Sequence, residues 1–235
     1  MAMTDARSNR SRRERRIVAA VIGVLVLGAG AVYAWAFGSA AVAYWNYAPQ
    51  EGDIVFQSLP HSPLVDAIEG ATHSPLSHCG IVSNQQGRWV VYEAFDGVEA
   101  VPLRDFIYRG RGGALAVYRL DEAHRRHIPA TIKHVQSYVG LPYDARYRMD
   151  DEAIYCTELI YKAYRDASGG DRLGTLIRLG ELDWRPYERT ITQLEGGPAP
   201  LDREMITPHA LARAAQLQSV YVHRLDAPTR SAPEP

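Results

Sequence analysis

The sequence predicts an α+β fold with an antiparallel sheet and packed helices, preceded by one N-terminal transmembrane helix. Short apolar segments with turn residues between them predict neighbouring antiparallel strands. Other segments carry apolar residues at helical spacing, and their mixture with the strands is typical of the α+β class. An uncharged apolar run near the N-terminus predicts the membrane segment. The length of 235 residues suits one compact domain with an extra segment.

The apolar run covers residues 17–43 without one charged residue, and it exceeds the about 20 residues that a helix needs to cross a bilayer. Six arginines lie in residues 1–16, so this basic end is expected in the cytoplasm and the rest of the chain across the membrane. A retained anchor is favoured because the run is longer than the apolar part of a signal peptide. Ala41-Val42-Ala43 resembles a cleavage site, so a secreted or periplasmic protein is the alternative.

The folded domain is expected over residues 46–226, followed by a disordered tail at 227–235. Strands are predicted over residues 52–56, 78–83, 89–95, 98–101, 114–120 and 219–225. Helices are predicted over residues 65–70, 103–110, 125–139, 156–168 and from Thr207 onward. Residues 171–206 show no clear pattern. We interpret them as an insertion over the core, with Trp184 and Tyr187 as candidates for substrate specificity.

The composition limits the classes of partner. A net charge of −1 at pH 7 gives the whole protein no electrostatic attraction to nucleic acid, so no nucleic-acid partner is expected, and no cofactor is expected either. A zinc site built from His73, His78 and Cys79 is rejected because these residues lack a recognised ligand spacing. The chain has two cysteines, Cys79 and Cys156, and a disulfide between them is permitted outside the cytoplasm.

The segment IYCTELIYKAY, residues 154–164, places Cys156 in the first turn of a predicted amphipathic helix. Unpaired amide groups and the positive end of the helix dipole meet there, and both lower the pKa of a thiol and favour an oxyanion. Cysteine is also a common buried core residue. Its position alone therefore leaves three roles open for Cys156: nucleophile, core residue or half of a disulfide.

A cysteine nucleophile needs a base, and the base needs an orienting partner. His78 begins a short apolar strand after a loop, where a side chain projects from the end of a sheet. Glu93 lies between apolar residues on the neighbouring strand, where an imidazole would be a suitable buried partner; the alternative is a solvated edge glutamate. Strand alternation predicts that Cys79 and His78 point to opposite faces of their strand. If His78 faces Cys156, this counts against a disulfide between Cys79 and Cys156.

Five motifs occur in the order GDIVFQ, THSPLSHCGIV, VVYEAF, GLPYD and IYCTELIYKAY. Together they resemble the permuted papain-fold cysteine amidases of the YiiX type, in the NlpC superfamily, over residues 52–168. ITPHALARA, further along the chain, resembles the closing helix of that family. The resemblance implies a circularly permuted papain-like (NlpC-type) fold, with His78 as base, Glu93 as orienter and Cys156 as nucleophile. It also implies four supporting positions whose roles stay open: Asp53, Tyr143, Asp144 and Tyr155.

The expected activity is hydrolysis of an amide or ester through an acyl thioester on Cys156. The expected substrate is a peptide, an amide or an acyl-lipid of the cell envelope, a class that comes from the predicted location and from the resemblance. Three alternatives remain. They are an acyltransferase of the same fold, a non-catalytic envelope binding module, and a redox protein that uses Cys79 and Cys156, although the chain lacks a CxxC pair.

Overall fold

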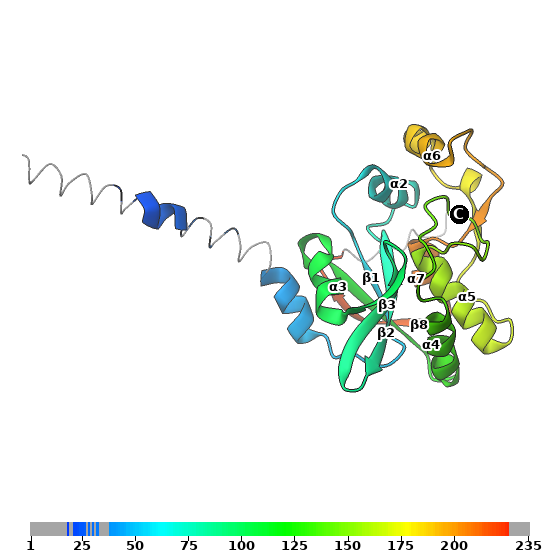
Figure 1. Ribbon diagram of the computed structural model, residues 1–235, viewed down its shortest axis with the longest axis horizontal. Coiled ribbons are helices and arrows are strands. Elements are labelled where there is room, and N and C mark those ends of the chain that lie inside the picture. The colour runs from blue at the N-terminus through cyan, green and yellow to red at the C-terminus, as the bar shows by residue number, and fades with distance from the viewer. Residues whose placement is uncertain are drawn as a thin grey trace, which may run out of the picture.

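A six-stranded sheet forms the centre of the molecule (Figure 1). The computed structural model describes residues 38–225 without a gap and, before them, residues 18, 21–26, 28, 30 and 32. The sheet order is β4-β3-β2-β1-β5-β8, and every neighbouring pair is antiparallel. Its strands are β1 (Ile54–Gln57), β2 (His78–Gln85), β3 (Arg88–Ala94), β4 (Val98–Pro102), β5 (Leu115–Leu120) and β8 (Leu217–His223). The expected mixture of an antiparallel sheet with packed helices is confirmed.

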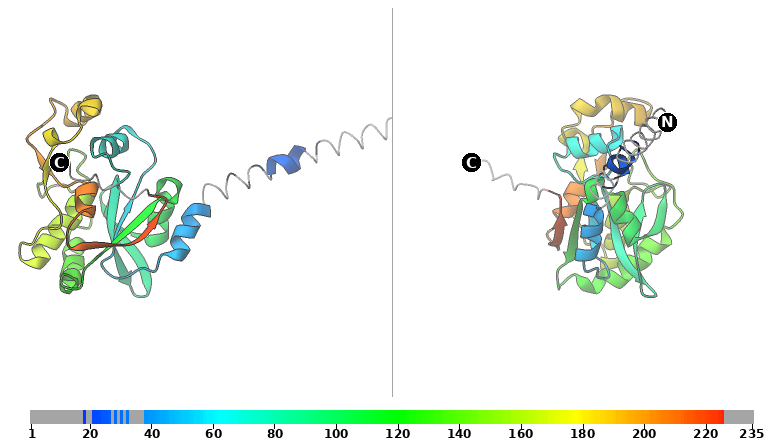
Figure 2. Two further views of the ribbon diagram at one scale, coloured as in Figure 1. Left: turned by 180° about the vertical axis from the view of Figure 1, so that it is seen from behind. Right: turned by 90° about the vertical axis from the view of Figure 1, so that its left-hand side faces the viewer.

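Helices cover both faces of this sheet. The labelled α-helices of the chain are α2 (Pro63–Ala71), α3 (Leu103–Arg109), α4 (Ile128–Ser137), α5 (Cys156–Ser168), α6 (Glu188–Glu195) and α7 (Pro208–Ala212). In Figure 1, α4 and α5 lie on one side of the sheet, and α3 with the helical residues 38–46 lies on the other. The view from behind in Figure 2 agrees. The longest of the six, α5, ends at Gly169, whose left-handed conformation (φ 79°) is the usual way to stop a helix.

Strand alternation divides the apolar side chains between two cores. Ile54 and Phe56 of β1 belong to the core that contains α4 and α5, while Val55 between them belongs to the core that contains α3. The first core includes Cys79, Ile81, Tyr92, Ile132, Val135, Leu159, Ile160 and Ala163, and the second includes Val82, Val91, Phe106, Ile107 and Leu115. Each large side chain buried in this way contributes about 1.5–3 kcal/mol. These contacts hold α5 against β2.

Residues 171–206, interpreted from the sequence as an insertion, form only short elements. β6 (Ile177–Arg178) and β7 (Glu204–Met205) pair as a separate two-stranded antiparallel sheet. Two 3-10 turns and α6 fill the rest, and α6 packs against α2 beyond the end of the main sheet (Figure 1). Elements of two to eight residues are too short to show a clear periodicity, which is why the sequence pattern did not reveal them.

The helix predicted over residues 125–139 is shorter than expected. Residues 125–127 form a 3-10 turn, and the α-helix itself is α4 (Ile128–Ser137). Pro129 lies in its first turn, where a missing N–H group is tolerated. The proline therefore marks a helix start within the predicted segment.

The helical residues 38–46 are part of the folded domain, although the sequence pattern assigned most of them to the membrane anchor. Ala40 and Ala43 are buried in the core that contains α3. The Tyr47 ring stacks on Tyr221 of β8, with 5.9 Å between the ring centres. The backbone of this helix also approaches Gly113 closely, because a Cβ added to that glycine would lie 2.5 Å from Ala40 N. The folded unit therefore begins at or before residue 38, earlier than the predicted boundary at 46.

Most of the predicted transmembrane segment, residues 17–43, falls outside the described part of the chain, as do the basic segment 1–16 and the tail at 227–235. Among the residues that are described, no helix has both the length and the apolar character needed to cross a bilayer. The anchor and the orientation of the chain therefore stay predictions.

Replacing Gly113 with alanine is expected to destabilise the protein through its contact with the helix at 38–46. Gly113 has a φ of +70°, a conformation that costs other residues about 1–3 kcal/mol, and the new Cβ would also collide with Ala40. Gly112→Ala is a matched control, because its φ is +62° but an added Cβ there meets no atom within 4 Å. Urea unfolding of the full-length chain should show the larger loss for Gly113→Ala. Equal losses of stability in the two variants would contradict a close contact between Gly113 and Ala40.

Candidate active site

Cys156 is the first residue of α5, and the segments around it hold the start of this helix in place. The Tyr155 N–H group donates to the Glu158 carboxylate at 3.2 Å, and Thr157 Oγ1 donates to the Ile206 carbonyl at 2.6 Å. Ile206 N–H in turn donates to the Tyr155 hydroxyl at 3.0 Å. These bonds hold the first turn of α5, with its unpaired amides, in a fixed position, and Cys156 in that turn is only 1% exposed.

His78 and Glu93 lie on adjacent strands and bind each other. His78 is the first residue of β2, and Glu93 of β3 lies opposite Gly80. The His78 Nε2 atom is 2.5 Å from Glu93 Oε2, and both side chains are buried. Because His78 and Gly80 share one face of β2, the register itself directs the carboxylate toward the imidazole. The structure therefore brings these two predicted residues together.

Two residues at the start of β2, His78 and Cys79, influence the pKa of the Cys156 thiol. The bond with the Cys79 thiol lowers the pKa of Cys156 most, burial opposes this, and the bond to His78 adds to it, so the pKa lies well below its ordinary value. Burial works against a charged imidazole, but hydrogen bonds to Cys156 and Glu93 outweigh it and raise the pKa of His78 to about 9. The favoured state is a thiolate paired with an imidazolium.

Cys79 points to the face of β2 opposite the one that His78 occupies, as predicted, but this direction brings it toward Cys156 and not away from it. Cys79 lies in the same core as Cys156 and α5, and its thiol lowers the pKa of Cys156. Alternation along β2 was assigned correctly, but α5 covers the face that Cys79 occupies, and His78 reaches Cys156 from the end of the strand. Burial and the neighbouring Cys156 thiolate raise the pKa of the Cys79 thiol. Both cysteines are free within the described chain.

Arg109, at the end of α3, is a member of this cluster that the sequence analysis did not identify. Its Nη2 atom donates to both oxygens of the Glu93 carboxylate. Burial would raise the pKa of Glu93, but hydrogen bonds from His78 and Arg109 lower it overall. The only hint in the sequence was that a buried carboxylate needs compensating charge, and no local pattern assigns that charge to α3.

Three tyrosines line the surroundings of Cys156. The hydroxyl groups of Tyr143 and Tyr147 lie 3.0 Å apart, and the Tyr147 ring lies 4.6 Å from that of Tyr155. Burial and the nearby Cys156 raise the pKa of both Tyr143 and Tyr147, so their hydroxyl groups keep their protons and can donate. Tyr143 and Tyr155 were predicted to support the site and do lie beside it. Tyr147, which the motifs did not include, joins them.

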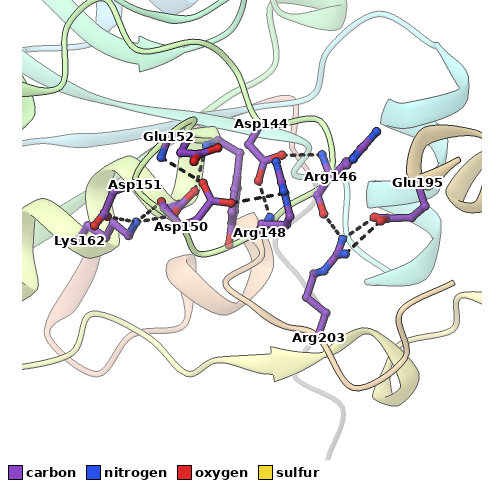
Figure 3. A network of polar contacts seen from close by, with 11 residues as sticks. Asp144, Arg146, Arg148, Asp150, Asp151, Glu152, Lys162, Glu195 and Arg203 are labelled. Carbon is purple, nitrogen blue, oxygen red and sulfur yellow. Dashed lines mark hydrogen bonds and ion pairs between the residues drawn. The ribbon is translucent and has the colours of Figure 1, made fainter. Parts of the chain in front are cut away.

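The two remaining predicted positions shape the backbone. The Asp144 carboxylate accepts from the N–H groups of Arg146 at 2.9 Å and Arg148 at 2.5 Å, which stabilises the loop before α5 (Figure 3). Asp53 precedes β1, at the end of that strand opposite the one that pairs with His78. It binds Tyr47 and Arg119, with Arg119 Nε at 2.6 Å. Asp53 is therefore not part of the group formed by Cys156, His78 and Glu93.

A buried lysine ties the same loop to α5. Lys162 Nζ donates to the Asp150 carbonyl at 2.5 Å and to Asp151 at 2.8 Å (Figure 3), and it lies 2.9 Å from the Glu158 carboxylate. Burial raises the pKa of Glu158 to about 7, although the Lys162 ammonium opposes this. Because Glu158 also accepts from the Tyr155 N–H group, this buried pair supports the helix turn that carries Cys156.

An apolar cavity of about 90 Å³ lies beside Tyr147, between α2, α6 and the segment that contains β7. Its walls include Leu64, Ile68, Leu179, Leu182, Ile191, Leu194 and Met205. Arg203 lines it as well and closes an ion pair with Glu195 of α6 while donating to the Arg146 carbonyl at 2.5 Å (Figure 3). Tyr147 therefore both lines this cavity and contacts Tyr143 and Tyr155.

Comparison with known proteins agrees with this architecture. Residues 48–221 match the family described as permuted papain-like amidase enzyme, YaeF/YiiX, C92 family. Protein YiiX of Escherichia coli strain K12 is 31% identical over 186 residues, which cover 77% of this chain and 90% of that protein. A crystal structure of YiiX from Escherichia coli O157:H7 has a TM-score of 0.70 at 31% identity and covers 75% of this chain and 99% of that one. The chain belongs to the YaeF/YiiX family of permuted papain-like amidases.

Proposed function

We propose that this protein is a cysteine-dependent amidase in which Cys156 is the nucleophile, His78 the base and Glu93 the orienter of the base. The observation that carries the proposal is the buried His78–Glu93 pair, with His78 Nε2 2.5 Å from Glu93 Oε2, beside a Cys156 thiol whose pKa His78 helps to lower. Membership of an amidase family supports the reaction class. A binding module would not need a thiol of lowered pKa at a helix start, so catalysis is the better account.

The reaction begins with attack of the Cys156 thiolate on the carbonyl carbon of an amide. The first-turn N–H groups of α5 are suited to bind the oxyanion that forms. The His78 imidazolium then gives its proton to the leaving nitrogen, the C–N bond breaks and an acyl thioester remains on Cys156. Water attacks the thioester after losing a proton to His78, and the acid product leaves as the thiolate re-forms. An amine or alcohol in place of water would make the same intermediate a transferase.

For the substrate we propose a peptide or acylated lipid of the cell envelope. The support is the predicted placement of the domain beyond the membrane, with the N-terminal helix as anchor or as a cleaved signal. The apolar cavity next to Tyr147 suits an apolar group attached to the scissile carbonyl. Because the Cys156 residue is 1% exposed, the surrounding tyrosines have to move before such a substrate reaches the thiol.

No step of the proposed mechanism uses a metal ion. The YiiX crystal structure is described as a metalloprotein. In the part of this chain that the structure describes, no group of three or more His, Cys, Asp and Glu residues is placed to hold a metal ion, so the donor set does not fit one. The proposed steps therefore use side chains and first-turn amides.

The test uses p-nitrophenyl acetate and p-nitrophenyl octanoate with the full-length chain. Wild type should release a burst of one nitrophenolate per chain and carry the acyl group on the peptide that contains Cys156, as mass spectrometry would show. Cys156→Ala should give neither. His61→Ala, a change at an exposed histidine, serves as the control and should keep both. A wild-type burst no larger than that of Cys156→Ala would overturn the proposal.

The pH dependence should distinguish amides from activated esters. His78 must be protonated to serve as the acid for an amine leaving group, and its pKa is raised to about 9. Cleavage of an acyl-alanine p-nitroanilide should therefore stay high through neutral pH and fall above about pH 9. Acylation by a nitrophenyl ester should not fall there, because nitrophenolate leaves without a proton. Identical alkaline behaviour of the two substrates would contradict the assigned role of His78.

A further inference from the structure

The Glu93 carboxylate is held from two sides, and only one of them belongs to the proposed triad. His78 Nε2 contacts Oε2 at 2.5 Å, while Arg109 Nη2 donates to both oxygens. Glu93 itself is fully buried. A buried carboxylate that lacks a cation is strongly destabilised or takes up a proton. Arg109 can therefore offset the charge of Glu93 and hold its carboxylate in one orientation while His78 gains and loses its proton.

Two aromatic rings hold Arg109 and His78 together. The Arg109 guanidinium lies 4.1 Å from the centre of the Phe95 ring and 5.7 Å from that of Phe106. The His78 ring meets Phe95 edge to face at 5.6 Å and stacks on Phe106 at 5.7 Å. Cation–π contacts and packing restrict the guanidinium to this position. A displacement of Arg109 would thus change the positions of the Glu93 carboxylate and the His78 imidazole.

The charges of the cluster balance only when Arg109 is included. Cys156 on α5 and Glu93 on β3 carry negative charge in the thiolate form, and His78 and Arg109 carry positive charge. Cys79, beside His78 on β2, stays neutral because burial raises the pKa of its thiol. Without Arg109 the buried set has a net negative charge, which favours the protonated form of each titrating group. The thiol would then ionise less readily, and the imidazolium would release its proton less readily.

We propose that Arg109 is a positioning residue of this site, which holds the Glu93 carboxylate for His78 and balances the charge of the thiolate–imidazolium pair. This inference rests on the proposed function. It requires that loss of the Arg109 charge moves both the acid and the alkaline limb of activity to higher pH. A structural role alone would lower the amount of active protein and leave both limbs in place.

The experiment follows His78 by NMR in full-length protein with ¹⁵N-labelled histidine, using His78→Ala to assign its signals, and follows Cys156 by iodoacetamide alkylation across pH. Arg109→Met should raise the His78 midpoint by about one pH unit and shift the Cys156 midpoint in the same direction. Arg104→Met, on the same helix, should move neither. Arg109→Lys should keep both midpoints but slow the nitrophenyl acetate burst roughly tenfold, because an ammonium does not reproduce the planar contact across the two oxygens.

The outcomes separate the two proposals. Unchanged or lowered midpoints in folded Arg109→Met, against a wild type with a lowered Cys156 midpoint and a raised His78 midpoint, would overturn the role of Arg109 alone. If Arg109→Met does not fold, Arg109→Lys decides, and a burst as fast as that of wild type would overturn the positioning role. Ordinary midpoints for both groups in wild type would overturn the proposed function and this inference with it.

Discussion

Replacing His78 with alanine is expected to raise the alkylation midpoint of Cys156 from well below the ordinary thiol value toward that value. The Cys79 thiol lowers the pKa of Cys156 most, and the hydrogen bond and positive charge of His78 stabilise the thiolate further. Once the imidazole is gone, burial of the sulfur opposes ionisation with less compensation. At pH 6 the thiolate fraction, and with it the alkylation rate, should fall by about tenfold or more.

The same substitution should slow acylation by the nitrophenyl esters by about 10²–10⁴-fold, which is the usual effect of losing a general base. Alkylation is measured by mass spectrometry on the peptide that contains Cys156, so that reaction of Cys79 is counted separately. His61→Ala should match wild type in both measurements. An alkylation midpoint that does not respond to His78→Ala would show that the thiol and the imidazole are not coupled, whatever their distance.

The pairing of His78 with Glu93 could be predicted from the sequence because it follows from local rules. Alternation along two strands joined by a short turn decides which side chains share a face, and the turn length nearly decides the register. The start of α5 was predictable for a similar reason, since the apolar spacing after Cys156 has a clear helical period. The resemblance to a known family then joined these separate local predictions into one site.

The contacts of Arg109 and Cys79 depend on tertiary packing, which no local pattern contains. Whether α5 covers the face of β2 that carries Cys79 is decided by how the helices distribute over the two faces of the sheet. Likewise, Arg109 reaches Glu93 only because α3 crosses the opposite face from α5. A helix of seven residues with a terminal arginine looks in sequence like any surface helix.

The helix at 38–46 shows a different limit. Its alanines lie in the same apolar run that predicts the membrane segment, and hydropathy does not distinguish a helix buried against protein from one buried in lipid. The contact with Gly113 and the burial of Ala40 and Ala43 reveal the difference. For the alternative of signal cleavage after Ala43, this arrangement means that cleavage would remove part of the folded core.

Replacing Lys162 with methionine is expected to destabilise the protein by about 3–5 kcal/mol at pH 8, the usual effect of removing one partner of a buried ion pair. Methionine keeps most of the volume of the lysine stem, so the loss reflects the charge more than the packing. Glu158 would be left buried without its cation, 2.9 Å from where the ammonium stood. The loop at Asp150 and Asp151 would also lose its tie to α5.

The loss should depend on pH with a definite sign. The pKa of Glu158 is raised to about 7 in the folded protein, above its value in the unfolded chain, so the folded state binds an extra proton between these two values. The contribution of Glu158 therefore favours folding at low pH and is lost as pH rises through about 7. Without Lys162 this folded pKa rises further, and the destabilisation should be clearly smaller at pH 5 than at pH 8.

Urea unfolding at pH 5 and pH 8 measures both effects, with Lys133→Met as the control. Lys133 is exposed on α4, and its replacement should change stability by less than about 0.5 kcal/mol at either pH. The double variant Lys162→Met with Glu158→Gln separates charge from packing, because it removes the stranded carboxylate. It should be more stable than Lys162→Met at pH 8 and nearly equal to it at pH 5, where Glu158 is already neutral. A loss that is the same at both pH values would show that packing and the loop contacts, and not the buried charge, make Lys162 important for the turn that carries Cys156.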